Sequence, residues 1–454
     1  MRSRKYSARD IALIVMNEVD AGDAYANLAL SRVLEETKPG PLDRAFATEV
    51  VYGSLRSLNT LDWILQQHIK KPLEKQTPWI RNILRLGVYQ MMYMDRVPPS
   101  AAVNEAANQA RRFGHPGQVS FVNGVLRNVL RKKDQLSFPS LEEYPVDHIS
   151  LKYSHPSWLV ERWLSHLGME ETIELCKSNN RPAPNTVRTN TLKITREELL
   201  GTLTGEGLNV KKAPHAPEGI MIEGIGGLRG FKPFENGLFQ VQDESSMLVG
   251  HAVSPKPGSL VLDAASAPGG KATHMAQIME DRGTVIAFDI HSHKLRLIEE
   301  NCRRLGITCI KPLEADARKI DGDFAGKADY VLLDAPCTGT GVLRRRPDLR
   351  WKKNQGQLPE IIELQKEMLE SASRCLKPGG VLVYSTCSVL NEENIGQVDK
   401  FLESNGSFRL ESLNSFLPET LGEADTVRRG FVQLYPHRQG TDGFFMARIR
   451  RTEG

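Results

Sequence analysis

From Gln240 to its end, the chain alternates short apolar runs with helical stretches. Runs of strand length lie at LVLDAA, TVIAFDI, CIKPLEAD, YVLLDAP and VLVYST, and a late pair, FVQLYP and FFMARIRR, predicts a hairpin. Regular alternation of this kind predicts a doubly wound α/β sheet. In such a sheet the carboxyl ends of the parallel strands open on the ligand crevice, so the residues that follow the strands are candidate site residues.

Two cysteines lie just past the ends of two of these strands. The run ADYVLLDAPC ends at Cys337, and GGVLVYSTCS brings Cys387, so we expect both thiols to face one crevice. A cysteine taken alone is most often a buried packing residue. The flanking TGTG and STCS are unlike a packed core, however. Both residues are therefore candidates for a thiolate that attacks a pyrimidine ring.

The segment from Asp263 to Lys271 follows the first strand and opens a helix. Its glycine pair lets the backbone approach a ligand closely. A Walker phosphate loop would need glycine where Ala265 stands and Ser or Thr where Ala272 stands, and a GxGxxG fingerprint is also absent. The loop is not built for phosphates.

Carboxylates at the strand ends indicate another ligand. Asp289 ends the second strand, 26 residues after Asp263, where it can accept both ribose hydroxyls of an adenosine; Asp316 ends the third strand and Asp334 the fourth. A single strand-end Asp is more often a helix cap. Four in one crevice would repel a pyrophosphate but suit an uncharged ribose and a cationic sulfonium. The predicted cofactor is S-adenosylmethionine.

Upstream of this region the chain divides into two further parts, so we expect domains at 1–140, 141–239 and 240–454. Ser7 and Asp10 predict a capping box at the first helix of an all-helical bundle. A linker at 135–150 and a helix running to about Leu167 follow, and then TVRTNTL, REELLGTLTGEG and GIMIEG predict a small α/β unit. This unit is RRM-like, without the aromatic RNA-binding signatures. The other bundle helices are expected near 42–58, 58–70, 77–94, 99–113 and 118–132.

Charge is unevenly distributed along the chain. Residues 1–140 hold 20 Lys and Arg against 13 Asp and Glu, a net of +7, whereas the rest hold 39 against 42. A basic helical domain indicates a polyanionic partner, although a solvated basic surface explains the charge about equally well. Six scattered cysteines show no CxxC pair and no zinc spacing, so they support neither a disulfide framework nor a metal site.

Hydrophobic content of 40% and charged content of 25% are typical of a soluble globular protein. No apolar run approaches the roughly 20 residues that span a bilayer, and the apolar stretch after the basic start is too short for a signal sequence. We expect a cytoplasmic protein that does not bind membranes. Nothing in the sequence indicates more than a monomer.

Four motifs together carry a resemblance to a known family: APGGK at 267–271, DAPC at 334–337, STCS at 385–388 and DGFF at 442–445. The chain resembles, over essentially its whole length, the RNA cytosine-C5 methyltransferases of the Sun/Fmu family. The resemblance implies a C-terminal Rossmann-like methyltransferase domain. Its N-terminal bundle is similar to the NusB-like RNA-binding domain, which in this family marks bacterial enzymes that methylate C5 of a cytosine in small-subunit (16S) ribosomal RNA.

The resemblance also implies a role for each site residue. Cys387 matches the nucleophile that adds to cytosine C6, and Cys337 matches the second cysteine, needed for product release. Asp334 lines the methyl-transfer site and, with Lys271, hydrogen-bonds the cytosine. Asp289 holds the cofactor's ribose and Asp316 lies by its adenine. The methionine end lies against the loop of Ala265, Ser266, Ala267, Pro268, Gly269, Gly270 and Lys271; the family usually has Cys-Ala-Ala-Pro where this chain has Ala-Ser-Ala-Pro.

A basic run directly after the Cys337 loop is a candidate RNA contact. It would bind phosphates flanking a base flipped out of its stack, and Trp351 within it would stack on a base. A solvated loop explains the run about equally well. The expected RNA-binding residues are Arg344, Arg345, Arg346, Arg350 and Lys352.

Three alternative functions stay open at this point. Transfer RNA is one, because no residue specifies a target sequence. A DNA cytosine methyltransferase would place its nucleophile at a Pro-Cys such as Pro336-Cys337. Cys387 and the basic helical domain favour RNA over DNA. A non-catalytic RNA-binding ribosome assembly factor is the third, although it would have no use for the carboxylates and both cysteines.

Overall fold

The structure is a computed structural model that describes residues 6–21, 24–225, 227–421 and 424–453. The chain forms two compact units. The first unit is Met1–Arg181 with Leu343–Lys353, and the second is Pro182–Val342 with Asn354–Gly454. A short segment from the second half of the sequence therefore belongs to the N-terminal unit.

The first unit is helical, as the sequence predicts. The predicted capping box is present, since the Asp10 N–H donates to Ser7 Oγ and the Ser7 N–H donates to Asp10 Oδ2, each at 3.1 Å. Its helices are α1 Ala8–Ala21, α2 Ala26–Thr37, α3 Pro41–Arg56, α4 Leu58–Gln66, α5 Pro78–Tyr93, α6 Pro99–Phe113, α7 Pro116–Lys132, α8 Pro145–Tyr153, α9 Ser157–Asn179 and the short α16 Leu349–Lys352.

Three features of this unit differ from the prediction. Helix α2 was not predicted, and α8 begins inside the expected linker. Helix α9 continues past the predicted end at Leu167, with a kink at Gly168, whose φ is 79°. A positive φ is easy for glycine, so the helix bends there and resumes.

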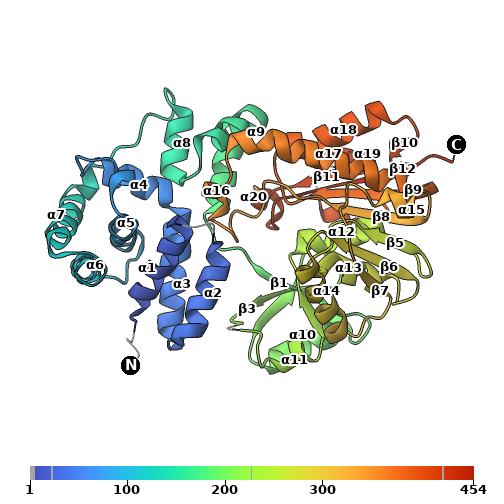
Figure 1. Ribbon diagram of the computed structural model, residues 1–454, viewed down its shortest axis with the longest axis horizontal. Coiled ribbons are helices and arrows are strands. Elements are labelled where there is room, and N and C mark those ends of the chain that lie inside the picture. Colours follow the sequence, from blue (N-terminus) through green and yellow to red (C-terminus); the bar gives the residue numbers. More distant parts are fainter. Residues whose placement is uncertain (1–5, 22–23, 226, 422–423, 454) are drawn as a thin grey trace. The chain divides into compact units, whose positions relative to one another are not determined.

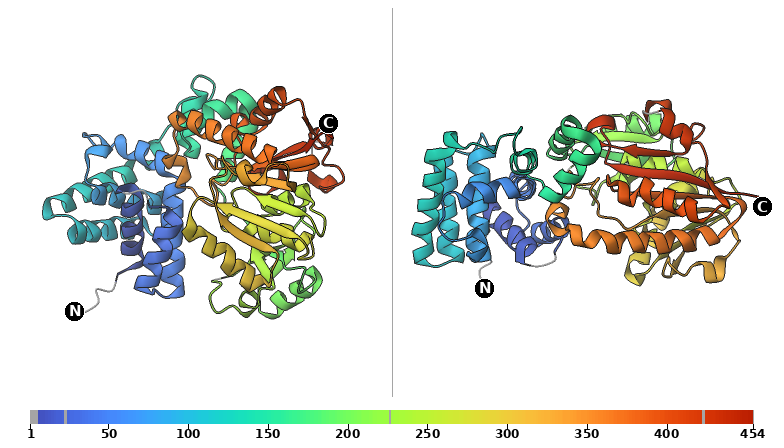
Figure 2. Two further views of the ribbon diagram at one scale, coloured as in Figure 1. Left: turned by 45° about the vertical axis from the view of Figure 1, so that its right-hand side comes forward. Right: turned by 90° about the horizontal axis from the view of Figure 1, so that it is seen from above.

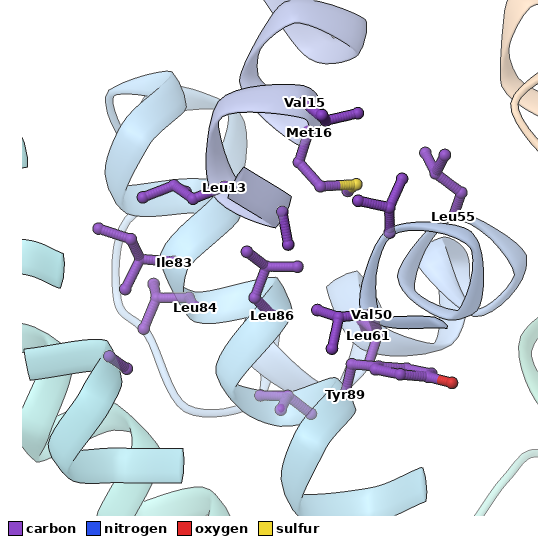
Figure 3. Close-up of a cluster of buried hydrophobic side chains, with 14 of the residues drawn as sticks. Leu13, Val15, Met16, Val50, Leu55, Leu61, Ile83, Leu84, Leu86 and Tyr89 are labelled. Atoms are coloured by element: carbon purple, nitrogen blue, oxygen red, sulfur yellow. The ribbon is translucent and has the colours of Figure 1, made fainter. Parts of the chain in front are cut away.

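Apolar side chains from α1 to α7 form the core of the bundle, and Figure 3 labels members from α1, α3, α4 and α5. Their spacing places one apolar face of each helix inward, and the burial of that face is what stabilises the helices. Leu13, Met16, Val50, Leu61 and Leu86 are all at most 1% exposed.

The second unit begins with a small antiparallel sheet of order β2-β3-β1-β4. Its strands are β1 Asn185–Thr189, β2 Asn209–Lys212, β3 Gly219–Glu223 and β4 Phe239–Val241, with helices α10 Arg196–Gly205 and α11 Lys232–Glu235. The sequence predicts β1, α10 and β3. It misses β2, whose sequence NVKK has a single apolar residue. It also misses β4, which is only three residues long and spans the expected domain boundary between residues 239 and 240.

The large sheet has the order β10-β12-β9-β8-β5-β6-β7, with β11 paired to β12. All five predicted strands are present and run parallel to one another, and the predicted hairpin of β11 and β12 adds β12 antiparallel to β9. The strands are β5 Leu260–Asp263, β6 Thr284–Asp289, β7 Ile310–Glu314, β8 Ala328–Asp334, β9 Leu376–Thr386, β10 Phe408–Leu410, β11 Phe431–Leu434 and β12 Phe444–Arg451.

Helices cover both faces of this sheet (Figures 1 and 2), as expected of a doubly wound fold. Successive residues of β5 alternate between two cores: Val261 packs with α12, α13 and α14, whereas Leu262 packs with α17 and α18. The helices are α12 Glu244–Val253, α13 Gly270–Ile278, α14 Ser292–Leu305, α15 Asp321–Phe324, α17 Leu358–Arg374, α18 Ile395–Ser404, α19 Ala424–Arg429 and α20 Pro436–Gln439.

Across the described ranges, no helix combines the length and apolar character that a membrane span requires.

Candidate active site

The two predicted cysteines meet at the carboxyl edge of the large sheet. Strands β8 and β9 are parallel neighbours, so the loops that follow them leave the sheet side by side. Cys337 and Cys387 are half-buried, and their Sγ atoms lie 3.3 Å apart. The Gly341 N–H donates to the Cys387 carbonyl at 2.9 Å, which ties the two loops together.

A half-buried ion pair lies at the same edge. Lys271, from the first turn of α13, donates to Asp334 at the end of β8 with Nζ and Oδ2 2.7 Å apart. Asp334 also accepts a hydrogen bond from Ser385 Oγ at 2.8 Å. Burial by itself would lower the pKa of Lys271, but the attraction of Asp334 prevails and raises it. Lys271 therefore keeps its charge inside the site.

Asp263, at the end of β5, is a fully buried carboxylate whose two oxygens have no hydrogen-bond partner. Burial raises the pKa of Asp263 to about 7, and the neighbouring charge of Asp334 adds to the rise. A buried carboxylate without a partner is costly, so this side chain indicates a missing cationic or hydrogen-bond-donating ligand.

The loop between β5 and α13 is held rigidly. The Ser266 N–H donates to the Phe288 carbonyl of β6 at 2.7 Å. Gly269 has a φ of 93°, and a Cβ there would lie 3.2 Å from Ile298, so this position requires glycine. From the small sheet, the fully buried Arg188 donates to the Gly270 carbonyl at 2.7 Å. Burial lowers the pKa of Arg188 to about 9.

The remaining two predicted carboxylates have partners of their own. Asp289 ends β6, and its Oδ1 accepts the His291 N–H at 2.9 Å in the turn before α14 and lies 3.7 Å from Lys294 Nζ. Asp316 lies two residues past the end of β7 and binds the Arg318 guanidinium, with Nη2 and Oδ2 2.6 Å apart. That pairing lowers the pKa of Asp316.

The residues at this edge fit S-adenosylmethionine. The unpartnered Asp263 supplies a buried carboxylate whose ionised form a sulfonium would stabilise, whereas Asp316 and Asp334 are already paired with cationic side chains. The glycine-containing loop leaves open space beside Gly270, where a Cβ would meet no atom within 4 Å. The loop residues Ala265 to Lys271 and Asp289 would hold this group.

The environment of Cys337 differs from that of a surface thiol. A hydrogen bond to Cys387, burial and the nearby charge of Glu393 all raise the pKa of Cys337 well above its usual range. Cys337 therefore retains its proton and can donate it in a hydrogen bond to the Cys387 sulfur.

The predicted RNA-binding run requires a correction. Residues 343–353 belong to the N-terminal helical unit, and Arg350 within them is 1% exposed. Its guanidinium donates to the carbonyls of Arg56, Ser154 and Asn179 and to Asn180 Oδ1, at 2.7–3.0 Å. The assignment of Arg350 to phosphate binding is wrong, because a residue buried in this way is out of reach of RNA.

The neighbours of Arg350 are also engaged, to different degrees. Lys352 Nζ donates to the Ala24 carbonyl and Trp351 Nε1 to the Leu55 carbonyl, each at 2.8 Å, so both side chains anchor the segment. Arg344 is buried, Arg345 is half-buried and Arg346 is exposed. Arg346 is the member of the run best placed to meet a solvent-borne phosphate.

Sequence reasoning missed two residues that shape the site. Ser385 lies within the STCS motif but received no role, although it orients Asp334. Glu393 lies in the polar run after Cys387 and is fully buried, with hydrogen bonds to both cysteine loops. An acidic residue in a short polar run has the sequence signature of a helix N-terminus, so no local signal distinguishes it.

Comparison with known proteins places three family models on the chain. The NusB family matches residues 6–131, the RsmF/B-like ferredoxin-like domain matches 155–227, and the model described as 16S rRNA methyltransferase RsmB/F matches 251–450. A relative from Bacillus subtilis (strain 168), named "Probable ribosomal RNA small subunit methyltransferase B", is 40% identical over 99% of both chains. The ribosomal RNA small subunit methyltransferase B of Escherichia coli O7:K1 is 33% identical over 93% of this chain and 94% of its own.

Solved structures are similar as well. The crystal structure of PH0851 is 30% identical with a TM-score of 0.83, over 99% of this chain and 100% of that one. The structure of NSun6 from Pyrococcus horikoshii with SFG is 28% identical with a TM-score of 0.59, over 66% of this chain and 99% of that one.

Proposed function

The chain belongs to the RsmB/F family of 16S rRNA methyltransferases, and from this premise we propose that it transfers a methyl group from S-adenosylmethionine to C5 of a cytosine in small-subunit ribosomal RNA. The observation that carries the proposal is the 3.3 Å separation of the Cys337 and Cys387 sulfurs at the strand edge that also bears the Lys271–Asp334 pair. Two thiols beside a charged pair suit covalent activation of a pyrimidine.

S-adenosylmethionine is the proposed methyl donor, held by the loop of Ala265 to Lys271, by Asp289 at the ribose and by Asp316 near the adenine. When bound, it supplies a methyl group activated by a sulfonium. The related NSun6 structure contains SFG, an analogue of S-adenosylmethionine, which supports the assignment. The unpartnered Asp263 supports it independently, because its buried carboxylate would interact favourably with a cation.

Cys387 is the proposed nucleophile. Cytosine C5 is a poor nucleophile because its electrons are committed to the ring. Addition of the Cys387 thiolate would form an S–C6 bond and shift electron density to C5. C5 would then be able to accept the methyl group from the sulfonium, which leaves the electron pair of the broken S–CH3 bond on the cofactor sulfur. Lys271 and Asp334 hydrogen-bond the polar edge of the cytosine and stabilise the charge that develops on the ring. Their own ion pair holds both groups in place beforehand.

Release of the product must break two bonds. The C5 proton leaves to a water molecule, because the protonated Cys337 thiol cannot accept it, and the C5–H electron pair restores the C5–C6 double bond. The C6–S electron pair returns to the Cys387 sulfur. Cys337, whose Sγ lies 3.3 Å from that sulfur, can donate a hydrogen bond to the departing thiolate. This arrangement supports a role for Cys337 in release.

Small-subunit ribosomal RNA is the proposed partner. The NusB-family segment at residues 6–131 and the excess of positive charge over residues 1–140 support RNA binding by the helical unit. Arg345 and Arg346 remain candidate phosphate contacts.

A labelling experiment tests the reaction and its substrate together. The protein is incubated with methyl-labelled S-adenosylmethionine and either protein-free 16S rRNA or transfer RNA, and the RNA is digested to nucleosides. We expect label in 5-methylcytidine from the ribosomal RNA alone. Label from transfer RNA would overturn the substrate, and no label in either RNA would favour a non-catalytic assembly factor.

Two cysteine variants test the mechanism. Cys387→Ala should abolish turnover and form no covalent complex. Cys337→Ser should trap a covalent protein-RNA adduct, visible as a shifted band on a denaturing gel. If Cys387→Ala formed an adduct through Cys337 instead, the roles of the two cysteines would be reversed.

A further inference from the structure

A fully buried glutamate connects the two cysteine loops. Glu393 lies in the turn between β9 and α18, is 0% exposed, and accepts hydrogen bonds from residues on both sides of the cysteine pair. The hydrogen bonds of its carboxylate go to Thr338, Gln365 and Ser388 and to neither cysteine sulfur, so the reaction proposed above gives Glu393 no step.

From the Cys337 loop, Thr338 makes two hydrogen bonds to this carboxylate. The Thr338 N–H donates to Oε1 at 2.8 Å, and its hydroxyl donates to Oε2 at 2.5 Å. Because Thr338 directly follows Cys337, these bonds fix the backbone that carries the Cys337 thiol.

From the Cys387 loop, Ser388 donates its hydroxyl to the same Oε2. Ser388 directly follows Cys387, so the residue after each cysteine binds one carboxylate. A third element, α17, contributes Gln365, whose Nε2 lies 3.2 Å from Oε1 and 2.9 Å from the Pro336 carbonyl. The main chain of Glu393 is also fixed, since its carbonyl accepts the Tyr384 hydroxyl at 2.6 Å.

Four donors that converge on two oxygens form an environment suited to an ionised carboxylate, which only accepts hydrogen bonds. Burial raises the pKa of Glu393, and the hydrogen bonds from Ser388 and Thr338 oppose the rise. The negative charge also helps Cys337 to retain its proton.

We propose that Glu393 is a positioning residue that ties the loop after β8 to the loop after β9 and so keeps Cys337 beside Cys387 during product release. This inference rests on the proposed function, in which Cys387 forms the C6 adduct and Cys337 is required to resolve it. Glu393 acts on the step in which the C6–S electron pair returns to the Cys387 sulfur, because that step needs the two sulfurs close together. Addition of Cys387 to C6 needs only one of them.

The test is a single-turnover experiment on the full-length protein with Glu393→Gln, which keeps the size of the side chain and removes its charge. The adduct is quantified on denaturing gels while methylated RNA is counted after release. We expect adduct formation at the wild-type rate and release slowed by roughly 10- to 100-fold, the scale for a reacting group misplaced by about 1 Å. The adduct should therefore accumulate, as in Cys337→Ser. Glu403→Gln, an exposed residue on α18, is the matched control and should release at the wild-type rate.

Release at the wild-type rate in Glu393→Gln would overturn the inference, and so would a defect in adduct formation as large as the defect in release. Should Glu393→Gln fail to fold, Thr338→Val decides, since it removes one donor and should also slow release selectively. Failure of the proposed function itself is recognised separately, because the wild type would then leave no label in RNA, or Cys387→Ala would still methylate it.

Discussion

Replacement of Arg350 by alanine separates a structural arginine from an RNA contact. The sequence places Arg350 in a basic run suited to phosphates, but the structure buries it against four oxygen acceptors from α3, the turn after α8 and the end of α9. The two roles predict opposite measurements, which makes this substitution informative.

The magnitude follows from those contacts. Four hydrogen bonds from a charged donor contribute about 1.5 kcal/mol each, or about 6 kcal/mol together. Removing the guanidinium also removes the cost of burying its charge, which is evident because burial lowers the pKa of Arg350 to about 9. Loss of one side of a buried charged network typically costs about 3–5 kcal/mol net. We expect Arg350→Ala to destabilise the helical unit by that amount, or by roughly 10 °C in Tm for a unit of this size.

The assay combines calorimetry with hydrogen exchange and RNA binding. Calorimetry on the full-length variant should show a lowered transition, and amides at the carboxyl ends of α3 and α9 should exchange faster. The salt dependence of RNA binding should be unchanged at a temperature where the variant is folded. Arg346→Ala is the control: this exposed residue should leave Tm unchanged, and if it contacts a phosphate it should reduce the salt slope by about 1. An Arg350→Ala variant with wild-type Tm and a reduced salt slope would refute the reasoning.

Three further predictions follow from the described side chains. Burial raises the pKa of Asp263 to about 7, and a bound cation favours the ionised form of this carboxyl. The affinity of the wild type for S-adenosylmethionine should therefore increase as the pH rises through 7. Calorimetric titration of Asp263→Asn should show no such increase. Burial, followed by the charge of Arg350, lowers the pKa of His155 well below 6.5, so below that pH the unfolded state binds more protons than the folded state. The helical unit should therefore lose up to about 1.4 kcal/mol of stability for each unit by which the pH falls below 6.5. Thermal melts of His155→Gln at pH 7 and 5 should differ less than those of the wild type, and an equal difference would exclude His155 as the cause. A Cβ on Gly341 would lie 1.9 Å from the Gly443 carbonyl oxygen and 2.8 Å from the Cys387 carbonyl oxygen. Gly341→Ala should therefore prevent formation of the protein-RNA adduct, as measured on denaturing gels. Gly322→Ala, where a Cβ meets no atom within 4 Å, should form the adduct normally.

Local sequence patterns determine the scaffold and its candidate thiols. Strand-length apolar runs separated by helical stretches can bury themselves only as a layered sheet, and parallel strands bring their carboxyl ends to one edge. For that reason Cys337 and Cys387, 50 residues apart in the chain, could be expected to share a crevice, and their sulfurs lie 3.3 Å apart. The same reasoning anticipates Asp334 and Lys271 at this edge, where they form an ion pair.

Strands and helices with weak local patterns could not be predicted from the sequence. Strand β2 has one apolar residue in four and β4 spans three residues, so both depend on pairing with β3 and β1. Helix α2 begins where the Ala26 N–H donates to Asp348 Oδ2, and that partner is 322 residues further along the chain.

Charge and hydrogen-bonding character are visible in a sequence, but the partner of each polar group is decided by residues far away in the chain. Arg350 and Arg346 belong to one basic run, yet one donates to carbonyls up to 294 residues away while the other is exposed. Glu393 reads as an acidic residue before a helix, and only the approach of Thr338, 55 residues earlier, shows that it links the two cysteine loops. The sequence by itself determined the order of the strands and helices and the thiols at their ends, because periodicity and turn chemistry act locally. Tertiary structure alone decided which charges are buried and what they bind, because burial depends on the elements that pack around them.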